Sequence, residues 1–114
     1  MAAMGRFVRG CIASLSVLFA CIGAGEGPAQ TVELGKALFA EKAEPPCALC
    51  HTLRAANSTG KIGPSLDELK PDLERIRKAV TNGVGNMPPY GETLSDAEID
   101  AVAKYVAGAV GTAK

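Results

Sequence analysis

The chain has 114 residues, which is enough for one small domain. Its 12 lysine and arginine residues balance its 12 aspartate and glutamate residues, so the formal net charge is zero. This balance excludes the basic footprint of a nucleic-acid-binding domain, and we expect no nucleic-acid partner. Aromatic residues make up only 4% of the sequence. The chain therefore supplies little large apolar surface for a core of its own.

The N-terminal segment has the pattern of a secretory signal peptide. Two arginines precede a long apolar run, and small residues follow it. This order is typical of a leader that is cleaved during export, and cleavage after either Ala24 or Ala29 fits it. We predict a signal peptide over residues 1–29 and one mature domain over residues 30–114.

Two alternatives remain open for this leader. An uncleaved membrane anchor is one, although the apolar run is shorter than the roughly 18 residues that a spanning helix needs. Lipidation at Cys21 is the other, because Leu18-Phe19-Ala20-Cys21 resembles a bacterial lipobox. Phe19 is bulky for that motif, so we prefer a cleaved leader.

Residues 31–43 have apolar side chains at helical spacing and predict the first helix. Thr31 is the expected N-cap. Gly35 in the middle costs roughly 1 kcal/mol relative to alanine, and a close crossing by another helix would explain it. Pro45-Pro46 ends the segment.

The segment Cys47-Ala48-Leu49-Cys50-His51 follows directly. Two cysteines separated by two residues and followed by histidine form the signature of covalent haem attachment. Both thiols form thioethers with the haem vinyl groups, and the adjacent imidazole ligates the iron. His51 is the only histidine in the chain. We predict one covalently attached haem c and, because such attachment takes place outside the cytoplasm, a periplasmic location.

Two other interpretations of this motif compete with haem attachment. A thioredoxin-type Cys-x-x-Cys lies beside a strand in a βαβ pattern, which is not visible here. A zinc site needs about four protein ligands, whereas only Cys47, Cys50 and His51 supply cysteine or histidine after the leader. Haem attachment is therefore the favoured interpretation.

Residues 52–60 predict a loop, and residues 67–69 a short helical turn. Between them lies Pro64, whose carbonyl group has no competing N–H of its own. A metal-bound histidine usually donates its other ring N–H to such an acceptor, so Pro64 is the candidate partner of His51. A plain Gly-Pro turn is the alternative.

Residues 71–82 predict another helix, with Pro71 in its first turn and a Glu74–Lys78 pair on its solvent side. Gly83 is expected to end this helix in the left-handed conformation. The following Gly/Pro-rich loop contains Met87, the only methionine beyond the leader. A thioether is the usual second axial ligand of electron-transfer haem. We predict Met87 as this ligand, with a packing role as the alternative.

The last helix opens at Ser95, which forms a predicted capping box with Glu98. Its apolar face makes it the expected partner of the first helix at Gly35. Gly108 and Gly111 are expected to let its C-terminal end fray.

In order and spacing these features resemble the class I cytochrome c family over about residues 31–110. The resemblance rests on the first helix, the Cys47–His51 motif, the Gly63–Leu66 segment, Met87 with its two following prolines, and the closing helix. It implies an all-α fold of four to five short helices around one haem. It also implies His51 and Met87 as axial ligands and one-electron transfer, with no enzyme activity of the chain's own.

The stretch from Cys47 to Pro71 also resembles the small cytochrome subunit of periplasmic sulfite dehydrogenases. That resemblance implies a molybdenum sulfite dehydrogenase subunit as electron donor and a downstream cytochrome or oxidase as acceptor. The alternatives are a free carrier for another dehydrogenase or a terminal oxidase, and a haem enzyme with an open iron site. A disulfide oxidoreductase without haem is a further alternative.

Overall fold

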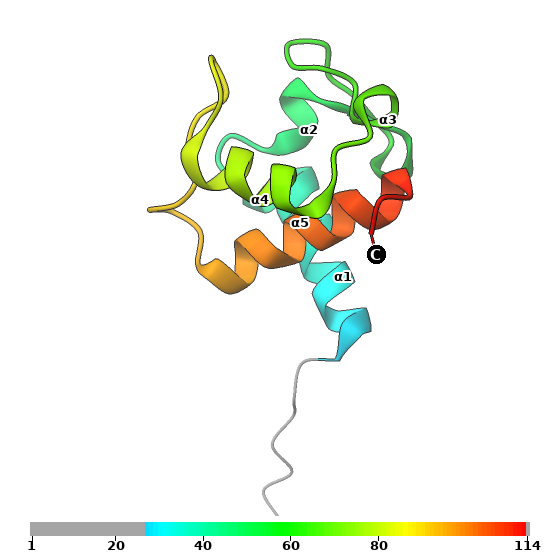
Figure 1. Ribbon diagram of the computed structural model, residues 1–114, viewed down its shortest axis with the longest axis vertical. Helices are drawn as coiled ribbons and strands as arrows, with labels where there is room; N and C mark the ends of the chain where they lie inside the picture. Colours follow the sequence, from blue (N-terminus) through cyan, green and yellow to red (C-terminus); the bar gives the residue numbers. More distant parts are fainter. Residues whose placement is uncertain (1–26, 114) are drawn as a thin grey trace, which may run out of the picture.

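The computed structural model describes residues 27–113, so the predicted signal peptide lies outside the described residues except at its end (Figure 1). The elements in chain order are α1 (Pro28–Ala37), a π-helical turn (Leu38–Lys42), α2 (Cys47–Cys50), β1 (Thr52–Leu53), a 3-10 turn (Arg54–Ala56), β2 (Ser58–Thr59), α3 (Leu66–Leu69), α4 (Leu73–Asn82) and α5 (Asp96–Val110). The predicted all-α class is confirmed. Across the described part of the chain, no helix combines the length and the apolar character that a bilayer crossing requires.

The first helix begins earlier than the sequence pattern predicts. Pro28 occupies its first position, and Gly27 is the N-cap, with its N–H donating to Gln30 Oε1 at 3.2 Å. Thr31 lies inside the helix, so its prediction as N-cap was wrong. Proline suits the first turn because that turn has no partner for its N–H, and the proline ring fixes a helical φ. The helix then continues through the π-helical turn as far as Lys42.

Helices α1 and α5 cross in contact at Gly35, as predicted (Figure 1). A Cβ atom at this position would lie 2.6 Å from the Tyr105 Cβ and closer still to the Ala101 carbonyl oxygen. Only glycine permits this approach. Beside the crossing, the rings of Phe39 and Tyr105 lie 6.0 Å apart at an angle of 59°.

The segment after His51 was predicted to be a loop and instead contains a short antiparallel hairpin. Thr52 pairs with Thr59, and Leu53 pairs with Ser58. Leu53 is completely buried, and its N–H donates to Ser58 Oγ at 2.9 Å. Burial of one apolar side chain and pairing of its backbone outweigh the turn-rich composition. The predicted helical turn after this hairpin is present as α3.

Helix α4 begins at Leu73 and not at Pro71. Asp72 is its N-cap, and its carboxylate accepts from the Arg75 N–H at 2.8 Å. Pro71 lies before the helix, where its carbonyl accepts from the Thr112 hydroxyl at 2.7 Å. A carboxylate that satisfies an orphan N–H is a stronger start signal than a proline in the first turn.

The end of α4 also differs from prediction. Gly83 has a positive φ of 73° but an extended ψ of 165°, which is outside the left-handed helical region. This conformation turns the chain sharply away from the helix. A Cβ at Gly83 would lie 2.6 Å from the Met87 carbonyl oxygen, so the loop that follows folds back against the helix end.

The predicted capping box of α5 is confirmed. The Glu98 N–H donates to Ser95 Oγ at 3.2 Å, and the Ser95 N–H donates to Glu98 Oε2 at 3.0 Å. The predicted fraying was wrong, because Gly108 lies inside the helix and Gly111 caps it with φ 79° and ψ 21°. The Thr112 hydroxyl then ties this end to Pro71.

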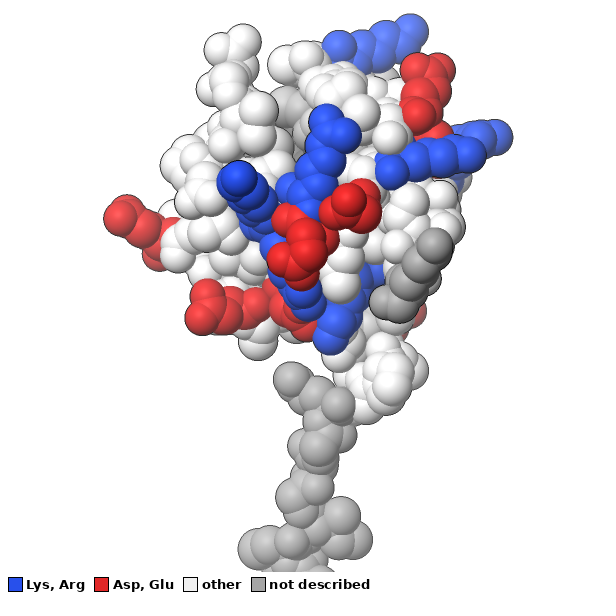
Figure 2. Space-filling view, viewed as in Figure 1, with Lys and Arg blue, Asp and Glu red and all other residues white. Residues whose placement is uncertain are grey.

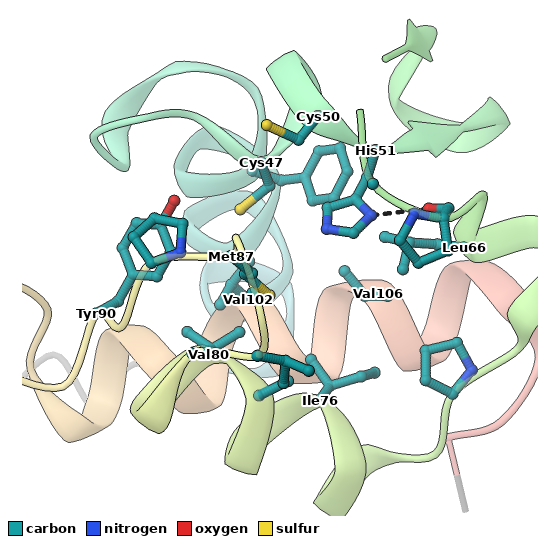
Figure 3. Close-up of a pocket in the computed structure, with 18 of the residues that line it drawn as sticks. Cys47, Cys50, His51, Leu66, Ile76, Val80, Met87, Tyr90, Val102 and Val106 are labelled. Atoms are coloured by element: carbon teal, nitrogen blue, oxygen red, sulfur yellow. Dashed lines mark hydrogen bonds between the residues drawn. The ribbon is translucent and has the colours of Figure 1, made fainter. Parts of the chain in front are cut away.

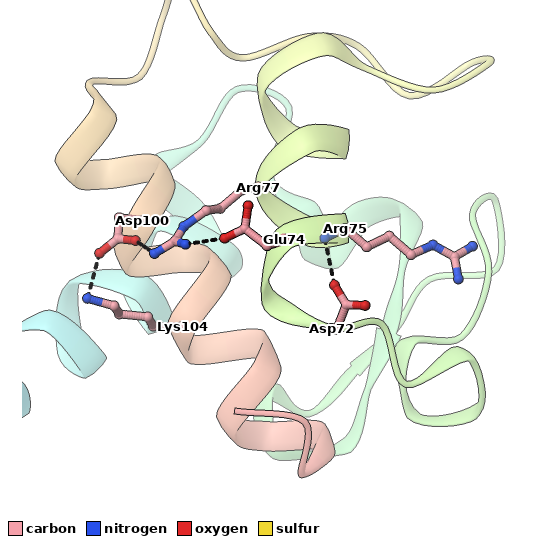
Figure 4. Close-up of polar contacts among 6 residues, drawn as sticks. All are labelled: Asp72, Glu74, Arg75, Arg77, Asp100 and Lys104. Atoms are coloured by element: carbon pink, nitrogen blue, oxygen red, sulfur yellow. Dashed lines mark hydrogen bonds and ion pairs between the residues drawn. The ribbon is translucent and has the colours of Figure 1, made fainter. Parts of the chain in front are cut away.

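Ion pairs join α4 to α5 on the outer surface. Arg77 pairs with Glu74 on its own helix and with Asp100 on α5, and Asp100 also pairs with Lys104 at 2.7 Å (Figure 4). Lys104 and Arg77 hold the pKa of the Asp100 carboxyl below its ordinary value. The sequence spacing predicted a pair between Glu74 and Lys78, but the ion pair that the structure shows for Glu74 is with Arg77. Figure 2 shows acidic and basic side chains interspersed over this face.

Candidate haem-binding site

A cavity of about 530 Å³ lies between the Cys47–His51 segment, α4 and the loop that contains Met87. Its volume is within the range of ordinary small-molecule and cofactor sites. Apolar side chains of α4 and α5 form its floor, and Figure 3 shows them facing the motif. These side chains are Ile76, Val80, Val102 and Val106. None of the described residues that line the cavity is acidic. Arg75 and Lys78 are its charged lining residues, so the cavity is mainly apolar with a basic part and suits a flat apolar ligand that carries negative groups.

Both cysteines of the motif lie on the cavity wall because α2 is a single helical turn. Cys47 opens this turn and Cys50 closes it, and both are free thiols. Burial raises the pKa of the Cys47 thiol to about 11. A reactive redox cysteine has the opposite property, a pKa lowered by positive charge or a helix N-terminus. The environment of Cys47 therefore does not favour a disulfide oxidoreductase.

His51 follows α2 and extends its imidazole into the same cavity (Figure 3). Its Nδ1 lies 2.8 Å from the carbonyl oxygen of Pro64, which is the hydrogen bond expected from the sequence. A carbonyl oxygen only accepts, so Nδ1 must carry the proton, and Nε2 of the neutral ring keeps a free lone pair. This is the tautomer that binds a metal through Nε2.

Gly63 makes room for this ring, a role that the sequence analysis missed. A Cβ at Gly63 would lie 2.6 Å from His51 Cε1 and 2.9 Å from Nδ1. The Gly63 N–H also donates to the Cys50 carbonyl oxygen at 2.7 Å, which joins the two segments. The Gly-Pro pair thus makes room for the imidazole as well as forming a turn. Because Gly63 lies 12 residues after His51 in the sequence, no local pattern predicted this contact.

Met87 also lines the cavity and is half-buried. Its backbone pairs with Val84 in both directions, with N–H to oxygen distances of 2.9 and 3.2 Å. This two-way pairing closes the tip of the loop. The cavity therefore has the motif cysteines, one imidazole and one thioether along its lining. The ligand role of Met87 stays a prediction.

Tyr90 closes the Met87 side of the cavity and is 4% exposed. Its hydroxyl donates to the Pro45 carbonyl oxygen at 2.6 Å. Burial raises the pKa of this hydroxyl to about 12, so it stays a donor at every physiological pH. Because 45 residues separate Tyr90 from Pro45, their hydrogen bond had no local sequence signal.

The residues present fit a covalently attached haem. Two thiols, an imidazole with a free Nε2 and a thioether all line one apolar cavity. Such a set matches the thioether links and axial ligands of an electron-transfer haem. The zinc alternative lacks support in the described range, where no group of three or more His, Cys, Asp and Glu side chains is placed to hold a metal ion.

Known proteins are similar to this chain in sequence, and one of them also in fold. A family model described as cytochrome c oxidase, cbb3-type, subunit III matches residues 30–106. Cytochrome c6 from Picosynechococcus sp. is 38% identical over 72 residues, which cover 54% of this chain and 62% of that protein. The match thus spans less than two-thirds of that relative's length. The crystal structure of the c-type cytochrome SorU from Sinorhizobium meliloti is 55% identical, with a TM-score of 0.70, and the match covers 75% of this chain and 98% of SorU. The chain therefore belongs to the cytochrome family of the matched model, and it is a c-type cytochrome of class I fold.

Proposed function

We propose that this cytochrome is a single-electron carrier with one haem held by thioethers to Cys47 and Cys50. His51 Nε2 and the Met87 sulfur would bind its iron. The observation that carries the proposal is the His51–Pro64 hydrogen bond, because it leaves Nε2 free in the cavity that also contains both thiols and Met87. Haem supplies the one-electron redox chemistry, and the protein needs no substrate site of its own.

The side chains around the cavity determine how easily the electron is taken up. Pro64 fixes the tautomer and orientation of the imidazole, which raises its basicity toward a metal. A methionine thioether as second ligand raises the reduction potential. The apolar floor formed by Ile76, Val80 and their neighbours on α5 excludes water and lowers the local dielectric. These are the levers with which a protein sets the potential of a bound haem.

The visible spectrum of the exported protein tests this proposal. A low-spin haem c spectrum with a methionine-to-iron charge-transfer band in the oxidised form is the expected result. Mass spectrometry should find one haem per chain after denaturation, because thioethers survive unfolding. A high-spin spectrum would support the alternative of a haem enzyme with an open iron site. Protein without haem would leave only the disulfide oxidoreductase alternative.

We further propose that the protein functions in the periplasm after removal of its leader. The signal-like pattern of residues 1–29 and the attachment motif support this location. The mass of the protein purified from a periplasmic fraction tests it. Cleavage after Ala24 or Ala29 is expected, whereas a diacylglycerol adduct at Cys21 or an intact leader in the membrane fraction would contradict it.

We propose a molybdenum sulfite dehydrogenase as the electron donor. The sequence from Cys47 to Pro71 supports this partner through its resemblance to the cytochrome subunits of such enzymes. The surface around the cavity opening also supports the docking of a protein partner there. Ile62 and Val84 line the cavity and are 77% and 64% exposed, so they mark an apolar rim where the cavity meets solvent. Exposed apolar groups of this kind commonly mark contact surfaces.

A further inference from the structure

Tyr90 links the Met87 loop to the segment that precedes Cys47. Its hydroxyl donates to the Pro45 carbonyl oxygen at 2.6 Å, across 45 residues of sequence. The ring is buried and lines the cavity beside Met87 (Figure 3). One side chain therefore spans the two parts of the chain that carry, in the proposed function, the thioether link and the second axial ligand.

The backbone of the same loop is held independently of the tyrosine side chain. The last carbonyl groups of a helix have no partner within it. At the end of α4, Val80 O accepts from the Tyr90 N–H at 2.8 Å, and Thr81 O accepts from the Gly91 N–H at 3.2 Å. Removal of the Tyr90 hydroxyl would leave these two bonds in place. The contribution of the Pro45 bond is thus separable from the folding of the loop.

We propose that Tyr90 is a positioning residue that holds the Met87 sulfur against the iron by fixing the Met87 loop to Pro45. The inference rests on the proposed function, in which Met87 is a ligand. At the start of the loop, Gly83 and Gly85 both have a positive φ. A Cβ at Gly85 would have no atom of the described residues within 4 Å. The tip is therefore lightly packed, and the firm attachments of the loop lie on the Tyr90 side.

Loss of the Tyr90 hydroxyl should weaken the Met87–iron bond without removing it. The Pro45 carbonyl would lose its buried donor, and the loop would move more freely away from the cavity. An added ligand that competes with the methionine would then bind more tightly, because less binding energy from Met87 must be lost when that ligand displaces it. The probe is imidazole, titrated into the oxidised, haem-loaded protein while the methionine-to-iron charge-transfer band is followed.

The test compares Tyr90→Phe with Tyr105→Phe. Both remove one hydroxyl from a buried tyrosine. Within residues 27–113, however, the Tyr105 hydroxyl has no hydrogen-bond partner, and Tyr105 is not among the residues that line the cavity. Tyr90→Phe should raise the apparent imidazole association constant by about threefold to tenfold. Tyr105→Phe should leave it unchanged. Equal imidazole affinity in wild type and Tyr90→Phe would overturn the proposal.

A second control separates positioning from general stability. Ile99→Val removes a methylene from the core on α5, away from the cavity lining. It should lower the thermal midpoint while leaving imidazole affinity at the wild-type value. If Ile99→Val raises the affinity as much as Tyr90→Phe, or if Tyr90→Phe alone fails to acquire haem, the hydroxyl is a folding element and the proposal is wrong. A wild-type spectrum without the charge-transfer band would instead contradict the proposed ligation by Met87.

Discussion

Met87 is the residue proposed as the second ligand of the haem iron. It lies in a loop and not on an apolar helix face, yet it lines the same cavity as His51. Met87→Ala should leave haem attached, because the cysteines and His51 are untouched. The oxidised iron should become high-spin or water-ligated, and the reduction potential should fall because the thioether is lost. Absorption spectroscopy and potentiometric titration measure both effects.

Val84→Ala is the matched control for this variant. Val84 pairs with Met87 through its backbone, lines the cavity and is 64% exposed. Its hydrocarbon side chain has no donor atom that could bind a metal. Its spectrum and potential should match those of the wild type. A low-spin spectrum and an unaltered potential in Met87→Ala would remove Met87 from the ligand set.

Tyr105 differs from Tyr90, because its buried hydroxyl forms no hydrogen bond with the part of the chain that the structure describes. Leaving such a group unpaired costs about 1–3 kcal/mol of desolvation. Tyr105→Phe keeps the ring that packs on Phe39. We expect it to preserve the stability of the haem-loaded protein or to increase it by about 1 kcal/mol, with a higher midpoint in thermal melting. A clear loss of stability would show that the hydroxyl has a partner, such as a buried water.

At the scale of elements, the α1–α5 crossing depends on one glycine. Gly35→Ala would place a methyl group against the Ala101 carbonyl and the Tyr105 Cβ, so the helices must separate. We expect a loss of about 1–3 kcal/mol, the usual cost of overpacking. Gly108→Ala is the matched control. Gly108 also lies inside a helix, but a Cβ there would have no described atom outside its own helix backbone within 4 Å.

The two glycine variants should therefore change the thermal midpoint in opposite directions. Alanine at an open helical position is favoured over glycine by about 1 kcal/mol, so Gly108→Ala should raise the midpoint. Gly35→Ala should lower it. Similar stabilisation by both substitutions would mean that α1 and α5 do not approach each other as closely as the structure shows.

Local sequence signals predicted the elements whose causes are local. The capping box at Ser95 and Glu98 is present because both partners lie within one turn. The α1–α5 crossing was predictable because a glycine in the middle of a helix is costly, and a close crossing by another helix is a common reason for it. Asp72 was missed as a cap, since Pro71 gave a competing start signal one residue earlier. The hairpin at Leu53 was missed because its stability comes from burial against the rest of the fold.

The candidate site shows the same division. The motif Cys47–His51 and its partner Pro64 were found from spacing and donor chemistry. The seat that Gly63 provides for the imidazole, and the link from Tyr90 to Pro45, were not found. Both are contacts between segments that are distant in the sequence. Neither a glycine nor a tyrosine by itself indicates which distant residue it will contact. In the proposed function, those contacts set how firmly the ligands are held.

At the scale of the whole molecule, the charged and the apolar surfaces have different roles. Acidic and basic side chains are interspersed over the face of α4 and α5, where ion pairs join the helices (Figure 2, Figure 4). Exposed pairs of this kind contribute little stability each. The cavity rim instead has the exposed apolar residues Ile62 and Val84. An electron donor must approach the cavity, so this rim is the expected contact surface for a redox partner.

The proposed partner makes this surface testable. A molybdenum sulfite dehydrogenase incubated with sulfite should reduce the haem rapidly, as followed by stopped-flow absorption. Ile62→Ser should slow this reduction several-fold while leaving the spectrum and potential unchanged, because it removes apolar contact at the rim. Val32→Ser is the control, since Val32 is 46% exposed on α1 and does not line the cavity.

A permanent heterodimer should also copurify, since such interfaces bury more than the roughly 1,200 Å² of transient redox contacts. Rapid reduction by a different dehydrogenase, with none by the sulfite enzyme, would leave the carrier function intact and show that this partner is wrong.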